Sequence, residues 1–139
     1  MIGNKKDLLK EKIIEEMTAD FSNALEKNFD LAKKLIKITN EGKISVIFKN
    51  DLTGEEKILL YLIGKVYAEE AEISQTHEVD SKELMDELGF LKGSFYPIIK
   101  RLRDKKRINQ TRKGKYTLFS IPSNQIERIL TKINRKLNL

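Results

Sequence analysis

The first forty residues are dominated by apolar positions three or four apart, which is the spacing of one face of a helix. These positions are Leu8, Leu9, Ile13, Met17, Phe21, Leu25, Phe29, Ala32, Leu35 and Ile36. A weak break at ADFSN (residues 19–23) leaves two alternatives, one long helix or two helices in series, ending at about residue 40. The pattern then changes to alternation in KISVIFK, which predicts a short strand with Ile44, Val46 and Phe48 on one face.

The next segment, NDLTGEEKILLYLIGKVYAEEAE, predicts a helix at the centre of a core. Thr53 and Glu56 have the spacing of a capping box, and the helix should end near Ala71. Its apolar residues occupy more than one stripe, as expected of a helix surrounded by other elements. These residues are Ile58, Leu59, Leu62, Ile63, Val66 and Tyr67. A polar loop with His77 follows, and we expect this histidine to be exposed.

A short helix and a longer basic helix come next. Asp80, with a glutamate three residues on, repeats the capping logic ahead of SKELMDELG, and Gly89 ends that helix. The following GSFYPIIKRLRDKKRI has helical periodicity but contains Pro97. With Ser94 as N-cap, the proline falls at the third helical position, where a missing backbone N–H costs little. We therefore expect a helix over residues 94–106.

The end of the chain predicts a hairpin and a helix. INQTRKGKYTLFSI indicates two short strands around a tight turn at Lys113-Gly114, because glycine supplies the positive φ that a two-residue turn requires. Pro122 ends the hairpin, and SNQIERILTKINRKL predicts a closing helix with Ser123 as N-cap. The apolar face of this helix is formed by Ile126, Ile129, Leu130, Ile133 and Leu137.

Charge is distributed unevenly along the chain, although the net charge is only +6. Residues 1–50 carry ten Lys or Arg against eight Asp or Glu, and residues 51–91 carry three against eleven. Residues 92–139 carry fourteen against two, a net charge of +12, and ten of these cations fall within residues 92–115. A basic block of this density favours a polyanionic partner such as nucleic acid.

Composition disfavours several other classes of site. The chain has no cysteine and a single histidine, so we expect no disulfide and no thiolate or multi-histidine metal site. The acidic clusters at residues 69–72 and 86–87 have no nucleophile, histidine or metal-ligand partner in the pattern, so we expect no catalytic residues and no enzyme. No apolar run approaches the roughly 20 residues of a membrane span. We expect a cytoplasmic protein without a cofactor.

Taken in order, residues 52–121 give a helix, a loop, a short helix, a tight turn, a helix and a β-hairpin. This order resembles that of winged helix-turn-helix DNA-binding proteins. Locally, SFYPIIKRL is similar to the recognition helix of PadR-type transcription regulators, in which a Tyr-Pro pair precedes an apolar position and then Arg-Leu. The resemblance covers about half of the chain. It implies a mainly α fold with a small β-hairpin wing, in which residues 51–122 form a winged helix-turn-helix core. The periodicity adds an N-terminal helical extension with a short strand (residues 1–50), which has no counterpart in the family, and a C-terminal helix (residues 123–139).

The resemblance also assigns positions within the core. Phe95, Ile99 and Leu102 match the buried face of the recognition helix, and Ile108 matches the first inward residue of the strand that follows. Lys106 stands where members of the family usually have the glycine that stops the helix. Two alternatives follow, a helix that ends by another device or a helix that is one turn longer.

Base recognition needs polar side chains near the N-terminus of a helix in the major groove, whereas cations along the helix body contact phosphate. The candidates for base edges are Lys92, Ser94 and Tyr96. The candidates for phosphate are Lys100, Arg101 and Arg103. The wing candidates, for the minor groove or a neighbouring phosphate, are Arg112, Lys113 and Lys115. An alternative role for Tyr96 is to pack half-buried against the wing.

These features predict a sequence-specific transcription regulator that binds double-stranded DNA. We expect a homodimer, formed through the N-terminal helices, the C-terminal helix or both, so that two recognition helices meet half-sites about one DNA turn apart. One alternative is a protein-interaction or architectural winged-helix subunit of a nucleoprotein complex that binds nucleic acid without sequence preference. Binding of single strands would need more exposed aromatic residues than Tyr96 and Tyr116 provide. Periodicity alone assigns no small-molecule effector.

Overall fold

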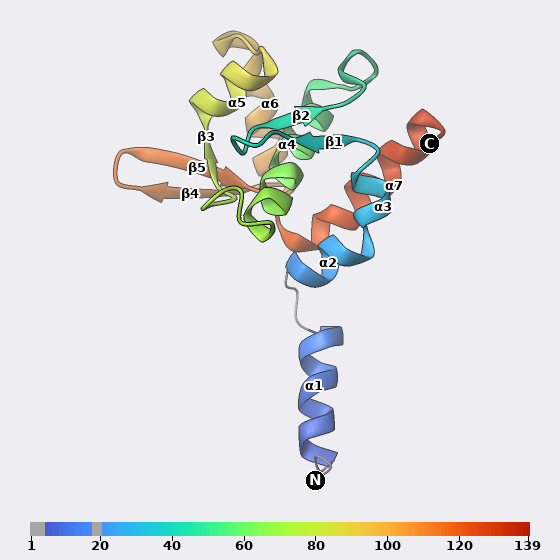
Figure 1. The fold of residues 1–139 in the computed structure, drawn as a ribbon. Coiled ribbons are helices and arrows are strands. Elements are labelled where there is room, and N and C mark those ends of the chain that lie inside the picture. The colour runs from blue at the N-terminus through green and yellow to red at the C-terminus, as the bar shows by residue number, and fades with distance from the viewer. Residues whose placement is uncertain (1–4, 18–20) are drawn as a thin grey trace.

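The computed structural model describes residues 5–17 and 21–139, which form a mainly helical fold with two small antiparallel sheets (Figure 1). The helices are α1 (Lys5–Met17), α2 (Phe21–Lys27), α3 (Phe29–Ala32), α4 (Gly54–Glu70), α5 (Ser81–Leu88), α6 (Lys92–Asp104) and α7 (Ser123–Leu137), and a 3-10 turn, η1, covers Lys49–Asp51. The strands are β1 (Ile36–Ile38), β2 (Ile44–Val46), β3 (Val79–Asp80), β4 (Asn109–Lys113) and β5 (Tyr116–Ser120).

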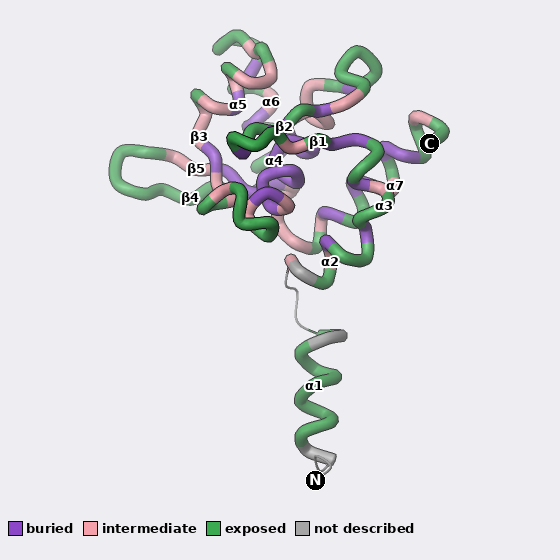
Figure 2. The backbone as a smooth tube through the Cα atoms, in the orientation of Figure 1, coloured by how far each residue is buried: buried purple, intermediate pink, exposed green. Residues whose placement is uncertain are grey.

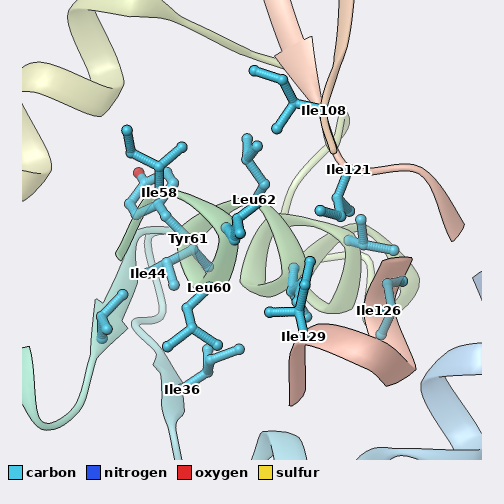
Figure 3. Packing of buried hydrophobic residues seen from close by; sticks show 14 of the residues in the cluster. Ile36, Ile44, Ile58, Leu60, Tyr61, Leu62, Ile108, Ile121, Ile126 and Ile129 are labelled. Carbon is cyan, nitrogen blue, oxygen red and sulfur yellow. The ribbon is translucent and has the colours of Figure 1, made fainter. Parts of the chain in front are cut away.

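Helix α4 lies at the centre of the molecule. It begins with the predicted capping box: Oγ1 of Thr53 accepts from the backbone N–H of Glu56 at 3.2 Å, and Oε1 of Glu56 accepts from the N–H of Thr53 at 2.8 Å. It is buried on several sides, as its apolar residues on more than one stripe predicted. The residues around it come from the β1–β2 sheet, from the two ends of the β4–β5 hairpin and from α7 (Figure 3), among them Ile36, Ile44, Ile108, Ile121, Ile126 and Ile129.

Strands β1 and β2 form a two-stranded sheet that packs on α4. Ile36 lies opposite Val46, and Ile38 lies opposite Ile44. The sheet approaches α4 at Gly64, where an added Cβ would come within 2.5 Å of Cγ2 of Ile44. The absence of a side chain at this position therefore sets the distance between helix and sheet.

Strand β1 corrects the prediction that the N-terminal helical pattern continues to about residue 40. Helix α3 ends at Ala32, and Ile36 and Ile38 instead alternate with a lysine along a strand. Pairing with β2 satisfies the backbone polar groups of this segment, which a frayed helix end would leave to water. Phe48 is also placed differently from the prediction, because β2 has ended and the residue has a left-handed φ of 62° and is 40% exposed.

The N-terminal segment is not one long helix, because Asn28 separates α2, which ends at Lys27, from α3, which begins at Phe29. The break predicted at residues 19–23 lies partly outside the described residues. Helices α2 and α3 pack on the body of the protein through Leu25 and Ala32. Helix α1 stands away from that body (Figure 1), and its side chains are exposed wherever the structure describes them (Figure 2).

Helices α5 and α6 follow the loop after α4. Oδ1 of Asp80 caps α5 by accepting from the backbone N–H of Glu83 at 2.8 Å, and Gly89 ends that helix with a φ of 74°. Helix α6 begins at Lys92, two residues earlier than predicted, with Leu91 at the N-cap position. The prediction that Ser94 caps the helix is therefore wrong, because the carbonyl of Leu91 already accepts from the N–H groups of Ser94 and Phe95.

The earlier start places Pro97 inside α6 and not in its first turn. Proline has no N–H to donate to the carbonyl four residues before it, which here belongs to Gly93. Gly93 is exposed, so water reaches the backbone at this point. The helix tolerates the proline because the carbonyl that loses its intrahelical partner lies at the surface.

Helix α6 ends at Asp104, two residues before the predicted end, and Lys106 takes the conformation that glycine favours. Lys106 has a φ of 58°, and its N–H donates to the carbonyl of Arg103 at 3.0 Å. The N–H of Arg107 donates to the carbonyl of Leu102 at 2.9 Å. These two bonds form a Schellman motif, so the helix ends at Asp104 and does not run a turn longer.

The second sheet has the strand order β3-β5-β4. Lys113 pairs with Tyr116, so the turn residues are Gly114 and Lys115, one position later than predicted. Gly114 has a φ of 62°, which supplies the backbone conformation expected of glycine in a two-residue turn. Helix α7 begins at Ser123, with Pro122 at the N-cap position, so the serine is the first helical residue and not the predicted cap.

Candidate nucleic-acid interface

Helix α6 has one buried face and one exposed face. Phe95, Ile99 and Leu102 are at most 3% exposed and pack into the core, as their spacing predicted. The opposite face carries the polar and basic residues of the helix. All six candidates on α6 are exposed: Lys92, Ser94, Tyr96, Lys100, Arg101 and Arg103. The amphipathic pattern thus brings the proposed base-contacting and phosphate-contacting residues to the surface of a single element.

The exposed face is open to a partner at its start and again at Lys100, in the second half of the helix. Within residues 5–17 and 21–139, neither Lys92 nor Lys100 has an acidic group within ion-pair distance. Tyr96 is 46% exposed, and its ring packs edge-on against the ring of Phe95 with centroids 5.3 Å apart. Its hydroxyl can therefore donate or accept outward while the ring is held by its neighbour.

The arginines at the end of the face are held by ion pairs and hydrogen bonds. Nε of Arg101 donates to Oε1 of Glu55 at 3.0 Å, and Nη1 of Arg107 lies 3.8 Å from the other carboxylate oxygen. Nη1 of Arg103 donates to Oε1 of Gln110 at 3.3 Å, which connects α6 to β4. Because the Arg101 side chain is 54% exposed, its ion pair contributes little to stability and phosphate can compete for it.

The β4–β5 hairpin projects from the body of the protein (Figure 1) and carries the wing candidates. Arg112 and Lys113 lie on β4, of which every residue is exposed, and Lys115 lies in the turn. Nζ of Lys113 is 2.7 Å from Oε1 of Glu78, and Nζ of Lys115 lies 5.6 Å from the ring centroid of Tyr116. Arg112 makes no ion pair with any described residue.

A polar cavity of about 200 Å³ lies where the first turn of α4 meets the end of α6 and helix α7. Its lining residues are Thr53, Glu55, Glu56, Leu59, Arg107, Ile129, Lys132 and Ile133. Burial by itself would raise the pKa of Glu56. Hydrogen bonds from Lys136, at 2.6 Å, and from Thr53 outweigh it and hold this pKa below its usual value. The carboxylate is therefore ionised and neutralised within the protein.

Sequence reasoning missed the association of Glu55 with Arg101 and Arg107. Glu55 lies 46 residues before Arg101 and belongs to the acidic block of the chain. No local pattern links the two segments, and only the packing of α6 against α4 brings them together. The net effect is that one carboxylate lies among the cations of the candidate interface.

His77 differs from its prediction. It is half-buried, because Nδ1 lies 3.1 Å from both carboxylate oxygens of Glu69 and the ring packs edge-on against Phe21 with centroids 5.1 Å apart. The contact fixes the loop after α4 to the start of α2. In the part of the chain that the structure covers, no group of three or more His, Asp or Glu side chains is placed to hold a metal ion.

Comparison with known proteins assigns neither a family nor a function to the chain. No protein-family model matches the chain, and no significant match occurs among the curated proteins or the solved structures. Among the helices of the described ranges, none combines the length and apolar character that crossing a membrane requires. Function is therefore inferred from the residues and their geometry.

Proposed function

We propose that the protein is a sequence-specific transcription regulator that binds double-stranded DNA through a winged helix-turn-helix core. The order α4, α5, α6 and hairpin supports this, as does the β3-β5-β4 sheet, in which a short strand before α5 joins the hairpin to the helices. The observation that carries the proposal is the exposed face of α6, which is polar at its start and cationic along its body. The protein would act in the cytoplasm, without a cofactor and without catalytic activity.

In this proposal the two halves of the α6 face have different tasks. Lys92, Ser94 and Tyr96 lie in the first turns, where a helix inserted in the major groove comes closest to base edges. The phosphate contacts come from Lys100, Arg101, Arg103, Arg112, Lys113 and Lys115. Six such contacts would give a plot of log K against log salt concentration with a slope of about −5 for each chain.

We also propose that the protein is a homodimer and that α1 forms the contact. Helix α7 buries its apolar face within its own chain, whereas Leu8, Leu9, Ile13 and Met17 on α1 are 41% to 78% exposed. An isolated helix of 13 residues is marginally stable in water, so α1 needs a partner surface to persist. This favours the N-terminal alternative among the dimer arrangements that the sequence allowed.

The test is selection from a pool of random duplexes by the full chain, followed by titration of selected and scrambled duplexes over a range of salt concentrations. The regulator proposal predicts enrichment of a motif, with palindromic half-sites if the dimer forms. Uniform, salt-sensitive binding without enrichment would contradict it. Absence of duplex binding at low salt would exclude any DNA-binding function.

The second candidate is an architectural or protein-interaction winged-helix subunit that binds nucleic acid without sequence preference. One observation favours it. Arg101, Arg103 and Lys113 already have partners within the chain, in Glu55, Gln110 and Glu78, and this reduces the number of cations free to position a recognition helix. Uniform binding in the duplex selection is the result expected for this candidate.

A further inference from the structure

Helix α7 carries a row of unpaired cations that the proposed DNA contacts do not use. Arg128, Lys132 and Arg135 are exposed and lie on the side of α7 opposite its buried apolar residues. Their spacing of four and then three residues places them along one helical face. Among the described residues, none of the three has an acidic partner within ion-pair distance. We name these three residues the α7 basic row.

This arrangement differs from that of the other charges on α7. Glu127 pairs with Lys27 at 3.3 Å, and Lys136 pairs with Glu56 at 2.6 Å. These two charges of α7, Glu127 and Lys136, are therefore neutralised within the chain. In the basic row, by contrast, like charges are neighbours on the helix, which is unfavourable for helix stability.

The helix dipole accounts for part of the row only. Cations in the last turn are favoured by the negative end of the dipole, which explains Arg135. Arg128 lies in the second turn and gains nothing from it. An unfavourable row of like charges with no partner inside the chain is expected where an external polyanion supplies the partner.

The row is continuous with the cations at the end of α6. Lys132 lines the same polar cavity as Arg107, which shares the carboxylate of Glu55 with Arg101. The two carboxylates in this cavity, Glu55 and Glu56, are both engaged by cations of the chain. A polyanion that follows α6 can therefore pass from Arg101 to Lys132 without meeting an unpaired carboxylate of the cavity.

We propose that the α7 basic row is a second phosphate-binding surface, which contacts the backbone of the same DNA duplex beyond the part read by α6. This inference rests on the proposed DNA-binding function. From Arg128 to Arg135 the helix rises about 10 Å, which matches the axial length of about three phosphates of one strand. The row contacts phosphate only, so it adds affinity and salt dependence and carries no base preference.

The test compares two triple variants with the same change in net charge. The first is Arg128→Gln/Lys132→Gln/Arg135→Gln. The matched control is Lys34→Gln/Lys37→Gln/Lys43→Gln, three exposed lysines on or beside the β1–β2 sheet. Each is titrated, as the full chain, against the selected duplex and against longer duplexes with flanking sequence, over a range of salt concentrations.

For the α7 variant we expect the magnitude of the salt slope to fall by about 2 to 3, since each lost phosphate contact removes about 0.9. Flanking DNA should strengthen binding of the wild type and of the control but not of the α7 variant, and the selected motif should be the same for all three. An α7 variant with the slope and flank dependence of the control would overturn the inference while leaving the proposed function intact. A wild type that binds no duplex would overturn both.

Two further measurements keep the outcome interpretable. Circular dichroism and thermal unfolding check that the α7 variant is folded. If it is not folded, the single variants Lys132→Gln and Arg135→Gln replace it. Each should reduce the magnitude of the salt slope by about 1. The charge-retaining variant Arg128→Lys/Arg135→Lys should keep the slope of the wild type. A smaller magnitude of the salt slope in that variant would contradict a role for the row as simple phosphate contacts.

Discussion

Arg101 of α6 donates through Nε to Oε1 of Glu55, 3.0 Å away at the start of α4. The second oxygen of the same carboxylate faces Nη1 of Arg107 at 3.8 Å. One acidic group thus holds two cations of the candidate DNA interface. It occupies the place that a phosphate oxygen would take if these arginines bound DNA.

Replacing this carboxylate should strengthen DNA binding. Glu55→Gln removes a negative charge from the interface and frees Arg101 and Arg107, so we expect duplex affinity to rise by roughly five-fold, or about 1 kcal/mol, at low salt. Titration over a range of salt concentrations measures the change. Glu87→Gln, which removes the half-buried partner of Lys43, is the matched control and should have little effect. Weaker binding of Glu55→Gln would mean that Glu55 orients the arginines for DNA.

Ser94 and Arg112 should make different contributions to DNA binding, the first to sequence preference and the second to affinity for all duplexes. Ser94→Ala removes a hydroxyl near the start of α6 and should change which duplexes are preferred, with little change in the salt slope. Arg112→Gln removes a wing cation and should weaken binding to all duplexes alike, lowering the magnitude of the slope by about 1. Repeating the random-duplex selection with both variants separates the two effects. If Ser94→Ala keeps both affinity and preference, the base-contacting turn has been placed wrongly.

Replacing Lys106 by glycine should stabilise the protein. The lysine ends α6 with a φ of 58°, a conformation in which a side chain costs roughly 1 kcal/mol that glycine avoids. Lys106→Gly should therefore raise the free energy of unfolding by up to about 1 kcal/mol, measured by urea denaturation. Lys105→Gly is the control, because Lys105 has a φ of −84° and gains nothing from glycine there. Equal effects of the two substitutions would count against this interpretation.

Two glycines should respond to alanine in opposite directions. At Gly64 a Cβ would lie 2.5 Å from Cγ2 of Ile44 and 3.0 Å from Cγ2 of Ile36, so Gly64→Ala should cost about 1 to 3 kcal/mol as the sheet is pushed from α4. At Gly93, in α6, a Cβ would have no heavy atom within 4 Å. Gly93→Ala should therefore stabilise the protein by about 0.5 to 1 kcal/mol through helix propensity. Thermal unfolding of both variants tests the pair.

Stability should fall steeply above about pH 10. Burial raises the pKa of Tyr67 to about 12, and burial together with the hydrogen bond to Glu83 raises the pKa of Tyr61 further. Both phenols stay protonated in the folded protein at a pH where the unfolded chain loses protons. Their contribution is therefore complete below the unfolded pKa, near 10, and is lost as the pH rises towards the folded values.

Tyr67→Phe tests this dependence. The variant loses the hydrogen bond to the carbonyl of Leu25 and should be less stable than the wild type at pH 8. Between pH 10 and pH 12 the free energy of unfolding of the variant should fall less steeply than that of the wild type. The difference in slope should be up to about 1.4 kcal/mol for each pH unit. Tyr116→Phe, which removes a hydroxyl at a position 55% exposed, is the matched control variant. A Tyr67→Phe profile parallel to that of the wild type would show that Tyr67 ionises equally in both states.

Local patterns predicted the elements whose signals lie within a few residues. The capping box of Thr53 and Glu56, the cap at Asp80 and the glycine stop at Gly89 are all confirmed, because each depends on contacts between near neighbours. The buried face of α6 was predictable for the same reason, since Phe95 and Ile99 follow helical spacing. Strand β1 was missed because a three-residue strand leaves too short a pattern to compete with the helical spacing before it.

The sequence alone determined the charge asymmetry of the chain, the succession of helices and hairpin, and the amphipathic character of α6, since all of these follow from composition and short-range periodicity. The tertiary structure decided which distant charges meet. It placed Glu55 between Arg101 and Arg107, and it set Lys132 of α7 in the same cavity as Arg107. Contacts between segments far apart in the chain depend on how α4, α6 and α7 pack on one core, and packing leaves no local pattern from which such pairs can be predicted.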